Sequence, residues 1–304
     1  MPPSRRTVPI LLLLGALSSL AADLGPDIAM HQDFKTTTFP PRSWTVHSGA
    51  GQSWQRMAGP AAAGGAATLG PARQEFALSA WLLSPEIDLE GMATPALSFY
   101  DRIDLESSGF NRLEVLVSLD YHGGDPEEAT WYALLCRQPH NAQPWRRSTI
   151  LLDEFRGQRI TIAFFGQLDG GDNAWAVDNV WVAEAETLTA SPPSVEAYGA
   201  DGQVALVWRA AGPADHYDVL RAAERHGQYF PVATVPATPH PALAFRDAAL
   251  VNGLTYWYRI RAVDAKGRSV YYSPLPATPT ASWSVIPATL PSTGPVTEIA
   301  LTRP

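Results

Sequence analysis

The stretch Trp175-Ala176-Val177-Asp178-Asn179-Val180-Trp181-Val182 places one carboxylate inside a run that otherwise has the composition of a buried β-strand. Valine and tryptophan favour strands, and a short apolar run is consistent with a strand that is buried in a sheet. A carboxylate in such a run costs free energy unless it accepts hydrogen bonds or binds a metal ion. Asp178 is therefore either a metal ligand or an acceptor for backbone amides.

Two further blocks of mixed apolar and acidic residues precede this stretch. One block is His31-Gln32-Asp33-Phe34, followed by Phe39-Pro40-Pro41-Arg42-Ser43-Trp44, and the other is Trp81-Leu82-Leu83-Ser84-Pro85-Glu86-Ile87-Asp88-Leu89. In this order the three blocks resemble the cleaved-adhesin or choice-of-anchor J group of jelly-roll domains, which are distant relatives of the MAM domains of animal receptors. The resemblance covers residues 28 to 186 and implies a jelly-roll β-sandwich.

The resemblance also implies a structural calcium ion. The first and last strands of a jelly roll often meet at one edge, so we expect Asp33 and Asp178 to lie close together, with backbone carbonyls completing a shell of oxygens. The family tends to have an acid after the opening phenylalanine, but this chain has Lys35 there, which repels calcium unless it points away. Asp169 and Asp172, in a glycine-rich loop without EF-hand spacing, are a second candidate for calcium or simply turn residues.

The N-terminus predicts export from the cell. Arg5 and Arg6 precede the apolar run 10–14 and small residues that end at Ala22, which is the layout of a secretory signal peptide. No later stretch approaches the roughly 20 apolar residues of a membrane-spanning helix, so we expect no membrane span after cleavage. Cys136 is the single cysteine, so the chain has no internal disulfide, which fits a bacterial exported protein.

The charge of the chain argues against nucleic acid as a partner. The formal net charge is −8, and it becomes −10 when the two arginines of the signal peptide are removed. An acidic surface repels phosphate backbones and suits divalent cations or plain solubility. We therefore expect an extracellular ligand, either a glycan or a protein.

A second all-β unit follows the prolines at 192 and 193. Trp208 lies in an alternating strand, and Leu250-Val251-Asn252-Gly253-Leu254-Thr255-Tyr256 leads into another, a spacing that resembles a fibronectin type III domain with Trp208 in the core and Tyr256 as the corner tyrosine. The predicted fold class is all-β, a jelly-roll β-sandwich followed by a fibronectin type III (immunoglobulin-like) β-sandwich. The predicted parts are a signal peptide (1–22), an adhesin-like jelly roll (23–190), a fibronectin type III domain (191–281) and a Pro/Thr-rich tail (282–304). The tail resembles the lead-in to a carboxy-terminal sorting domain, so either the chain is truncated before such a domain or the resemblance is chance. Because the proline-rich junction offers few contacts, we expect two independent domains with a hinge at residues 191–194.

The sequence favours binding over catalysis. It contains no His-Glu-x-x-His, Gly-x-Ser-x-Gly or Cys-x-x-Cys motif, so we predict that the protein is not an enzyme. Trp54, Trp131 and Trp145 lie outside the three family blocks and are either exposed platforms for sugar rings or core residues under loops. The predicted function is a secreted or cell-surface adhesion protein that carries its binding domain on a fibronectin type III spacer. The alternative is a carbohydrate-binding accessory module of a secreted hydrolase system.

Overall fold

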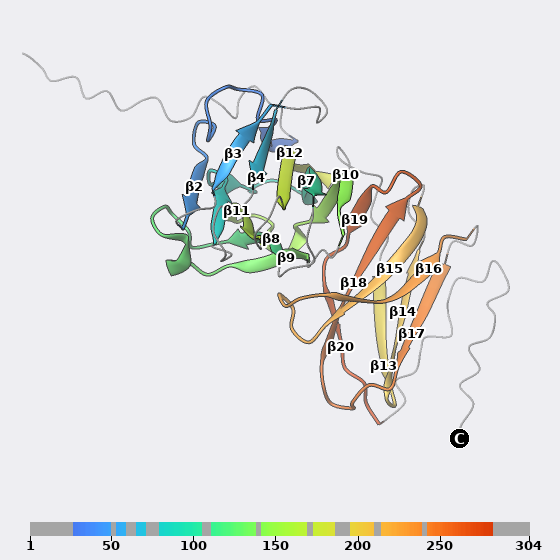
Figure 1. Ribbon diagram of the computed structural model, residues 1–304. Coiled ribbons are helices and arrows are strands. Elements are labelled where there is room, and N and C mark those ends of the chain that lie inside the picture. Colours follow the sequence, from blue (N-terminus) through green and yellow to red (C-terminus); the bar gives the residue numbers. More distant parts are fainter. Residues whose placement is uncertain are drawn as a thin grey trace, which may run out of the picture.

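A computed structural model describes residues 27–49, 53–58, 65–70, 79–104, 111–137, 141–168, 173–185, 195–209, 214–238 and 242–281. β-Strands dominate these residues and form sandwich-like sheets in two parts of the chain (Figure 1), which confirms the predicted all-β fold class. The predicted signal peptide, the hinge at 191–194 and the tail from 282 lie outside the described residues. Within the described residues, no helix has the length and hydropathy that a membrane crossing requires.

Residues 27–185 form the jelly-roll β-sandwich. One sheet has the order β10-β7-β12-β4-β3, with β1 on the same edge of β12 as β4, and the other has the order β2-β5-β11-β8-β9, with β6 beside β11. The strands of the first sheet are β1 (Ile28–Gln32), β3 (Trp54–Met57), β4 (Ala66–Leu69), β7 (Pro95–Asp104), β10 (Gln143–Leu151) and β12 (Ala174–Glu184). The strands of the second sheet are β2 (Thr45–Ser48), β5 (Ala80–Leu83), β6 (Ile87–Asp88), β8 (Arg112–Ser118), β9 (Tyr132–Arg137) and β11 (Arg159–Gln167).

Aromatic and aliphatic side chains from both sheets form the core of this sandwich. Successive side chains of a strand point to opposite faces, so one alternate set of each strand is directed inward. The ring of Phe164 on β11 lies 5.3 Å from that of Phe99 on β7 and 5.9 Å from that of Trp175 on β12, measured between centroids. These edge-on contacts across the interior fix the two sheets face to face.

Residues 195–281 form the fibronectin type III sandwich. One sheet contains β13 (Val195–Ala200), β14 (Gln203–Arg209) and β17 (Ala242–Ala248), and the other contains β15 (Ala214–Ala222), β16 (Phe230–Pro236), β18 (Tyr256–Asp264), β19 (Ser269–Tyr271) and β20 (Leu275–Ala277). Trp208 is buried in the core, and the hydroxyl of Tyr256 accepts a hydrogen bond from the Val251 backbone at 3.1 Å. Both predicted roles, the core tryptophan and the corner tyrosine, are confirmed.

The two sandwiches share a sheet, which corrects the expectation of few contacts between them. Strand β19 pairs in parallel with β10, with Ser148 opposite Ser269 and Ile150 opposite Tyr271, so the first sheet of the jelly roll continues into the second part (Figure 1). Side chains from β7, β10 and β12 also join the second hydrophobic core. The prediction of few contacts was based on the proline-rich junction alone. The contacts between the two sandwiches come instead from strands that lie far from this junction in the sequence.

Candidate functional site

The outer face of the second jelly-roll sheet carries aromatic side chains. Trp81 on β5 is paired with Phe165 on β11, and Phe165 with Glu114 on β8, so the three residues form one row across the sheet. The ring centroids of Trp81 and Phe165 are 4.6 Å apart, and Trp131, which precedes β9, lies 5.4 Å from Trp81. These side chains belong to a hydrophobic cluster separate from the core between the sheets.

A guanidinium and a carboxylate lie at the edge of this aromatic row. Two nitrogens of the Arg112 guanidinium donate hydrogen bonds to the Glu114 carboxylate, Nε to Oε1 at 2.8 Å and Nη2 to Oε2 at 2.9 Å. The guanidinium carbon of Arg112 is 5.3 Å from the centroid of Phe165. A bidentate ion pair stacked on a ring holds its hydrogen-bonding groups in a fixed direction, which is how a binding site obtains specificity.

A cavity of about 560 Å³ lies over these residues, and the second sandwich supplies its far wall. That wall consists of His226, Gly227 and Gln228, in the loop between β15 and β16. The loop is fixed to the jelly roll, because Arg225 is 2.8 Å from the Glu154 carboxylate and the His226 ring lies 4.7 Å from that of Tyr132. The cavity falls within the size range of small-molecule sites, about 300–1,000 Å³.

The described part of the cavity wall has two side chains that can lose a proton to become anions, Glu114 and Cys136. Glu114 is the one carboxylate among the described residues that line this cavity, and most glycoside hydrolases use a pair of carboxylates. Cys136 also lines the cavity, but burial, together with the nearby Glu114 carboxylate, raises the pKa of its thiol to about 12. A thiol with that pKa is not a nucleophile at neutral pH.

The three tryptophans predicted as sugar platforms have different positions. Trp131 lines the cavity, half-buried, and its indole Nε1 donates to the Pro126 carbonyl at 2.7 Å, which fixes the ring. For Trp54, the prediction of an exposed platform is wrong. Its side chain is only 2% exposed, and its ring lies 5.3 Å from that of Trp175 in the core. Trp145 lies on β10, outside the residues that line this cavity, with the Arg102 guanidinium 5.9 Å from its ring.

The first and last strands of the jelly roll meet as expected, with Asp33 directly after β1 and Asp178 on β12. Gln32 at the end of β1 lies opposite Val180 of β12, and the Asp33 carboxylate is near enough to raise the pKa of Asp178. Burial is the larger cause, and it raises that pKa to about 6, although the Asn179 backbone amide donates to Oδ1 at 2.7 Å. Asp178 therefore accepts backbone and amide hydrogen bonds, one of the two alternatives that its sequence context left open.

The side chains around Asp33 bear on the calcium hypothesis. Lys35 does not point away, because its Nζ lies 2.9 Å from Oδ2 of Asp33. Within the described residues, no group of three or more His, Cys, Asp or Glu side chains could hold a metal ion. A calcium ion here would have to displace Lys35 and take most ligands from the backbone, so calcium at Asp33 and Asp178 stays a proposal. Asp169 and Asp172 lie outside the described residues.

Sequence reasoning missed Trp81, Phe165, Arg112 and Glu114 as site residues. The available signal was the face of each strand: Phe165 alternates with the core residues Ile162 and Phe164, so it had to point outward. A cluster of large aromatic residues on the outward face of a sheet is either covered or marks a binding surface. The sequence assigned Trp81 to the fold instead, because it stands in one of the family blocks.

Comparisons with known proteins find structural neighbours of low sequence identity and no family. No protein-family model matches the chain, and no curated protein matches its sequence. The K1 cleaved adhesin domain of Lys-gingipain from Porphyromonas gingivalis W83 is 18% identical over 51% of this chain and 97% of that chain, with a TM-score of 0.41. The CBM22-1 xylan-binding domain of Paenibacillus barcinonensis Xyn10C is 16% identical over 52% of this chain and 94% of that chain, with a TM-score of 0.36.

A third structural neighbour covers a smaller share of the chain. A fibronectin type III-like protein from Clostridium thermocellum is 21% identical over 32% of this chain and 99% of that chain, with a TM-score of 0.27. At these identities and scores the neighbours are resemblances and carry no statement about activity. The site is therefore interpreted from its own geometry.

Proposed function

We propose that this protein is an extracellular or cell-surface binding protein without catalytic activity, and that the cavity over Trp81, Phe165 and Trp131 binds a glycan. The observation that supports this proposal is the combination of aromatic rings with a fixed Arg112–Glu114 pair in one cavity. The C–H face of a sugar ring packs on an aromatic face, while its hydroxyl groups need planar polar partners close by. Trp131, the most exposed of the three rings, and the Arg112–Glu114 pair offer these two kinds of surface. Trp81 (9% exposed) and Phe165 (5% exposed) are largely buried against Trp131 and Arg112.

The same cavity accounts for an adhesion role and for the carbohydrate-module alternative. An adhesin that recognises a surface glycan and an accessory module that recognises a polysaccharide need the same binding chemistry. In both cases the second sandwich does more than hold the jelly roll away from a surface, because its residues 226–228 complete the wall of the cavity. The two parts therefore act as one binding unit.

The test is glycan binding by the chain from residue 23 to 304, first on a glycan array and then by calorimetry with the glycans that bind. Trp131→Ala is expected to weaken binding about tenfold or more, the loss of one aromatic stacking contact, with the fold intact because Trp131 is only half-buried. Trp145→Ala is the matched control, since it removes a partly buried indole outside the cavity. Absence of any glycan ligand, or an equal loss in both variants, would contradict the proposal.

A further inference from the structure

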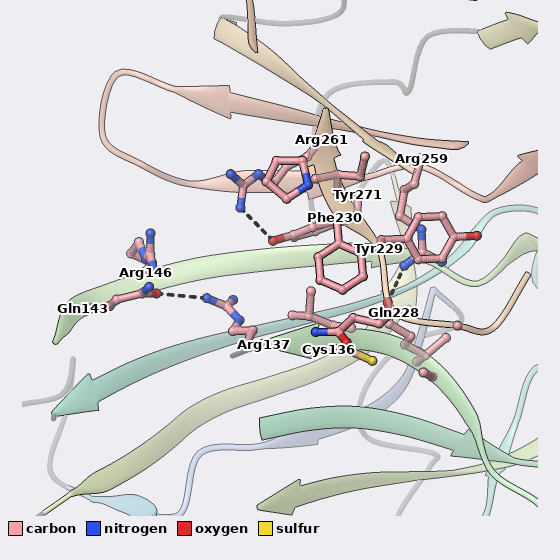
Figure 2. Close-up of a pocket in the computed structure, with 16 residues that line it drawn as sticks. Cys136, Arg137, Gln143, Arg146, Gln228, Tyr229, Phe230, Arg259, Arg261 and Tyr271 are labelled. Carbon is pink, nitrogen blue, oxygen red and sulfur yellow. Dashed lines mark hydrogen bonds between the residues drawn. The ribbon is translucent and has the colours of Figure 1, made fainter. Parts of the chain in front are cut away.

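A second cavity, of about 460 Å³, lies at the junction of the two sandwiches (Figure 2). Among the described residues that line it are four arginines, Arg137 and Arg146 from the jelly roll and Arg259 and Arg261 from the second sandwich, and no acid. Ala133, Cys136, Arg137, Gly227 and Gln228 line both this cavity and the one over Trp81. The two cavities therefore adjoin.

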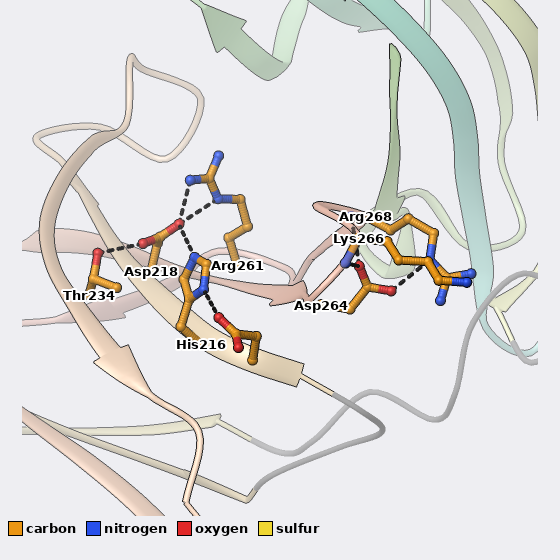
Figure 3. A network of polar contacts seen from close by, with 8 residues as sticks. His216, Asp218, Thr234, Arg261, Asp264, Lys266 and Arg268 are labelled. Atoms are coloured by element: carbon orange, nitrogen blue, oxygen red, sulfur yellow. Dashed lines mark hydrogen bonds and ion pairs between the residues drawn. The ribbon is translucent and has the colours of Figure 1, made fainter. Parts of the chain in front are cut away.

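Two of the four arginines are neutralised by buried carboxylates. Arg137 lies 3.2 Å from the carboxylate of Asp101, which is almost fully buried in the first sheet. Nε of Arg261 donates to Oδ2 of Asp218 at 2.8 Å, and Asp218 in turn accepts a hydrogen bond from Thr234 (Figure 3). These two guanidinium groups have their counter-charge inside the protein.

The other two arginines have no such partner. Among the described residues, no carboxylate lies within ion-pair distance of Arg146 or Arg259. Arg259 is only 2% exposed, donates from Nη1 to the Leu134 carbonyl and stacks 5.0 Å from the Tyr229 ring, while its Nε is buried without a hydrogen-bond partner. A buried guanidinium stays charged, so an unsatisfied one is costly unless an anion reaches it.

The environment of the cavity shifts the pKa values of two of its residues, Arg146 and Tyr271. The pKa of Arg146 is lowered, first by burial and then by the nearby Arg137 guanidinium. Burial raises the pKa of the Tyr271 phenol, but Arg261 and Arg137 outweigh it and the net pKa is lowered. The shift of Tyr271 reflects the positive charge of Arg261 and Arg137, in a protein whose formal net charge is −8 overall.

We propose that the junction cavity binds the anionic group of an acidic saccharide, a uronate carboxylate or a sulfate, at Arg146 and Arg259. This inference rests on the proposed function, because the adjoining cavity over Trp81 and Trp131 would take the neighbouring sugar units of the same ligand. A planar guanidinium presents paired donors that match the oxygens of a carboxylate or sulfate. The arginines thus select the charge of the glycan, and the aromatic rings select its sugar faces.

The test compares neutral and acidic oligosaccharides of equal length on the chain from residue 23 to 304. Calorimetry with xylohexaose, a hexamer of galacturonate and a heparin-derived hexasaccharide separates neutral, carboxylate and sulfate ligands. At least one acidic ligand is expected to bind about tenfold or more tightly than the neutral one, the change that one charge-assisted hydrogen bond supplies. Its affinity is expected to fall with added sodium chloride, while that of the neutral ligand stays constant.

The variant Arg146→Gln is expected to remove the preference for the acidic ligand and to leave neutral binding unchanged. Arg209→Gln, an exposed residue of β14, makes the same charge change as a control and keeps the preference. Equal affinity for neutral and acidic ligands, or a preference that survives Arg146→Gln, would overturn this inference and leave the proposed function standing. Absence of binding to every saccharide would overturn both. If Arg146→Gln lowers the melting temperature, the salt dependence of the unaltered protein tests the inference instead. Affinity for the acidic ligand that does not fall with sodium chloride would then overturn it.

Discussion

At the scale of single residues, Asp178 is the residue whose environment is least usual. It is 2% exposed, and its carboxylate is satisfied chiefly by Asn179, with the backbone amide at 2.7 Å and the side-chain amide at 3.1 Å. These hydrogen bonds favour the charged form, but burial outweighs them and holds its pKa near 6, above the ordinary value of 3.8. Without a bound cation, the charged form of Asp178 therefore destabilises the fold.

This shift gives a pH dependence of stability with a definite sign. Because the folded-state pKa of Asp178 is raised, the folded state binds more protons than the unfolded state between pH 4 and 6, and its stability falls as the pH rises through that window. In the presence of chelator, Asp178→Asn is expected to stabilise the protein at pH 7, by on the order of 2 kcal/mol. Urea unfolding of both proteins at pH 4, 5, 6 and 7 measures the difference. A variant that is less stable than the parent at pH 7 would contradict the prediction.

At the scale of elements, the pairing of β1 with β12 determines where the proposed calcium ion would act. Strand β1 is short and pairs with β12 from Ile28 to Gln32. Directly after it, the side chains of Asp33 and Lys35 form an ion pair. An ion shared by Asp33 and Asp178 would hold this first strand on the last one. Its binding would be opposed by the ammonium group of Lys35, which already neutralises Asp33.

Calcium is expected to raise the melting temperature, because an ion that binds only the folded state at about 100 times its dissociation constant adds about 2.7 kcal/mol. Lys35→Ala, which removes the competing ammonium, is expected to increase the calcium-dependent shift, and Asp33→Ala to abolish it. The measurement is calorimetric melting with chelator and with added calcium, on samples first shown to be free of metal. Identical melting curves with and without calcium in the parent and in Lys35→Ala would refute the proposal.

At the scale of the whole molecule, the continuous sheet through β10 and β19 joins the two sandwiches into one unit (Figure 1). Leu151, Ala96 and Ala183 of the jelly roll contribute to the second hydrophobic core. The Arg259–Leu134 hydrogen bond and the Arg225–Glu154 ion pair add polar contacts beside both cavities. A shared core and a shared sheet couple the unfolding of the two parts.

We therefore expect one cooperative unfolding transition for residues 23–304, in place of the two that independent domains would give. Calorimetry should give equal calorimetric and van't Hoff enthalpies. Mild proteolysis should release no stable fragment that corresponds to residues 195–281. Two resolved transitions, or a protected fragment of that part, would show that the junction is weak and that the cavities at it open readily.

The sequence by itself predicted the strands, the two sandwiches and two residues of the second core. These features depend on local patterns: the alternation of Val204, Leu206 and Trp208 gives the buried face of β14, and the spacing from Val251 to Tyr256 gives the corner. The alternation along β11 likewise shows that Phe165 points outward. The apolar run around Asp178 explains why its carboxylate had to be satisfied by hydrogen bonds or by a cation.

The tertiary structure alone decided which surfaces became cavities. Residues 226–228 cover Trp81 and Trp131 only because β19 pairs with β10, and no local pattern encodes that docking. Likewise Arg259 follows Arg137 and Arg146 by more than a hundred positions and shares one cavity with them because the two sandwiches meet there. Alternation along a strand specifies the face of each side chain, whereas the partner that covers that face depends on packing between residues more than a hundred positions apart.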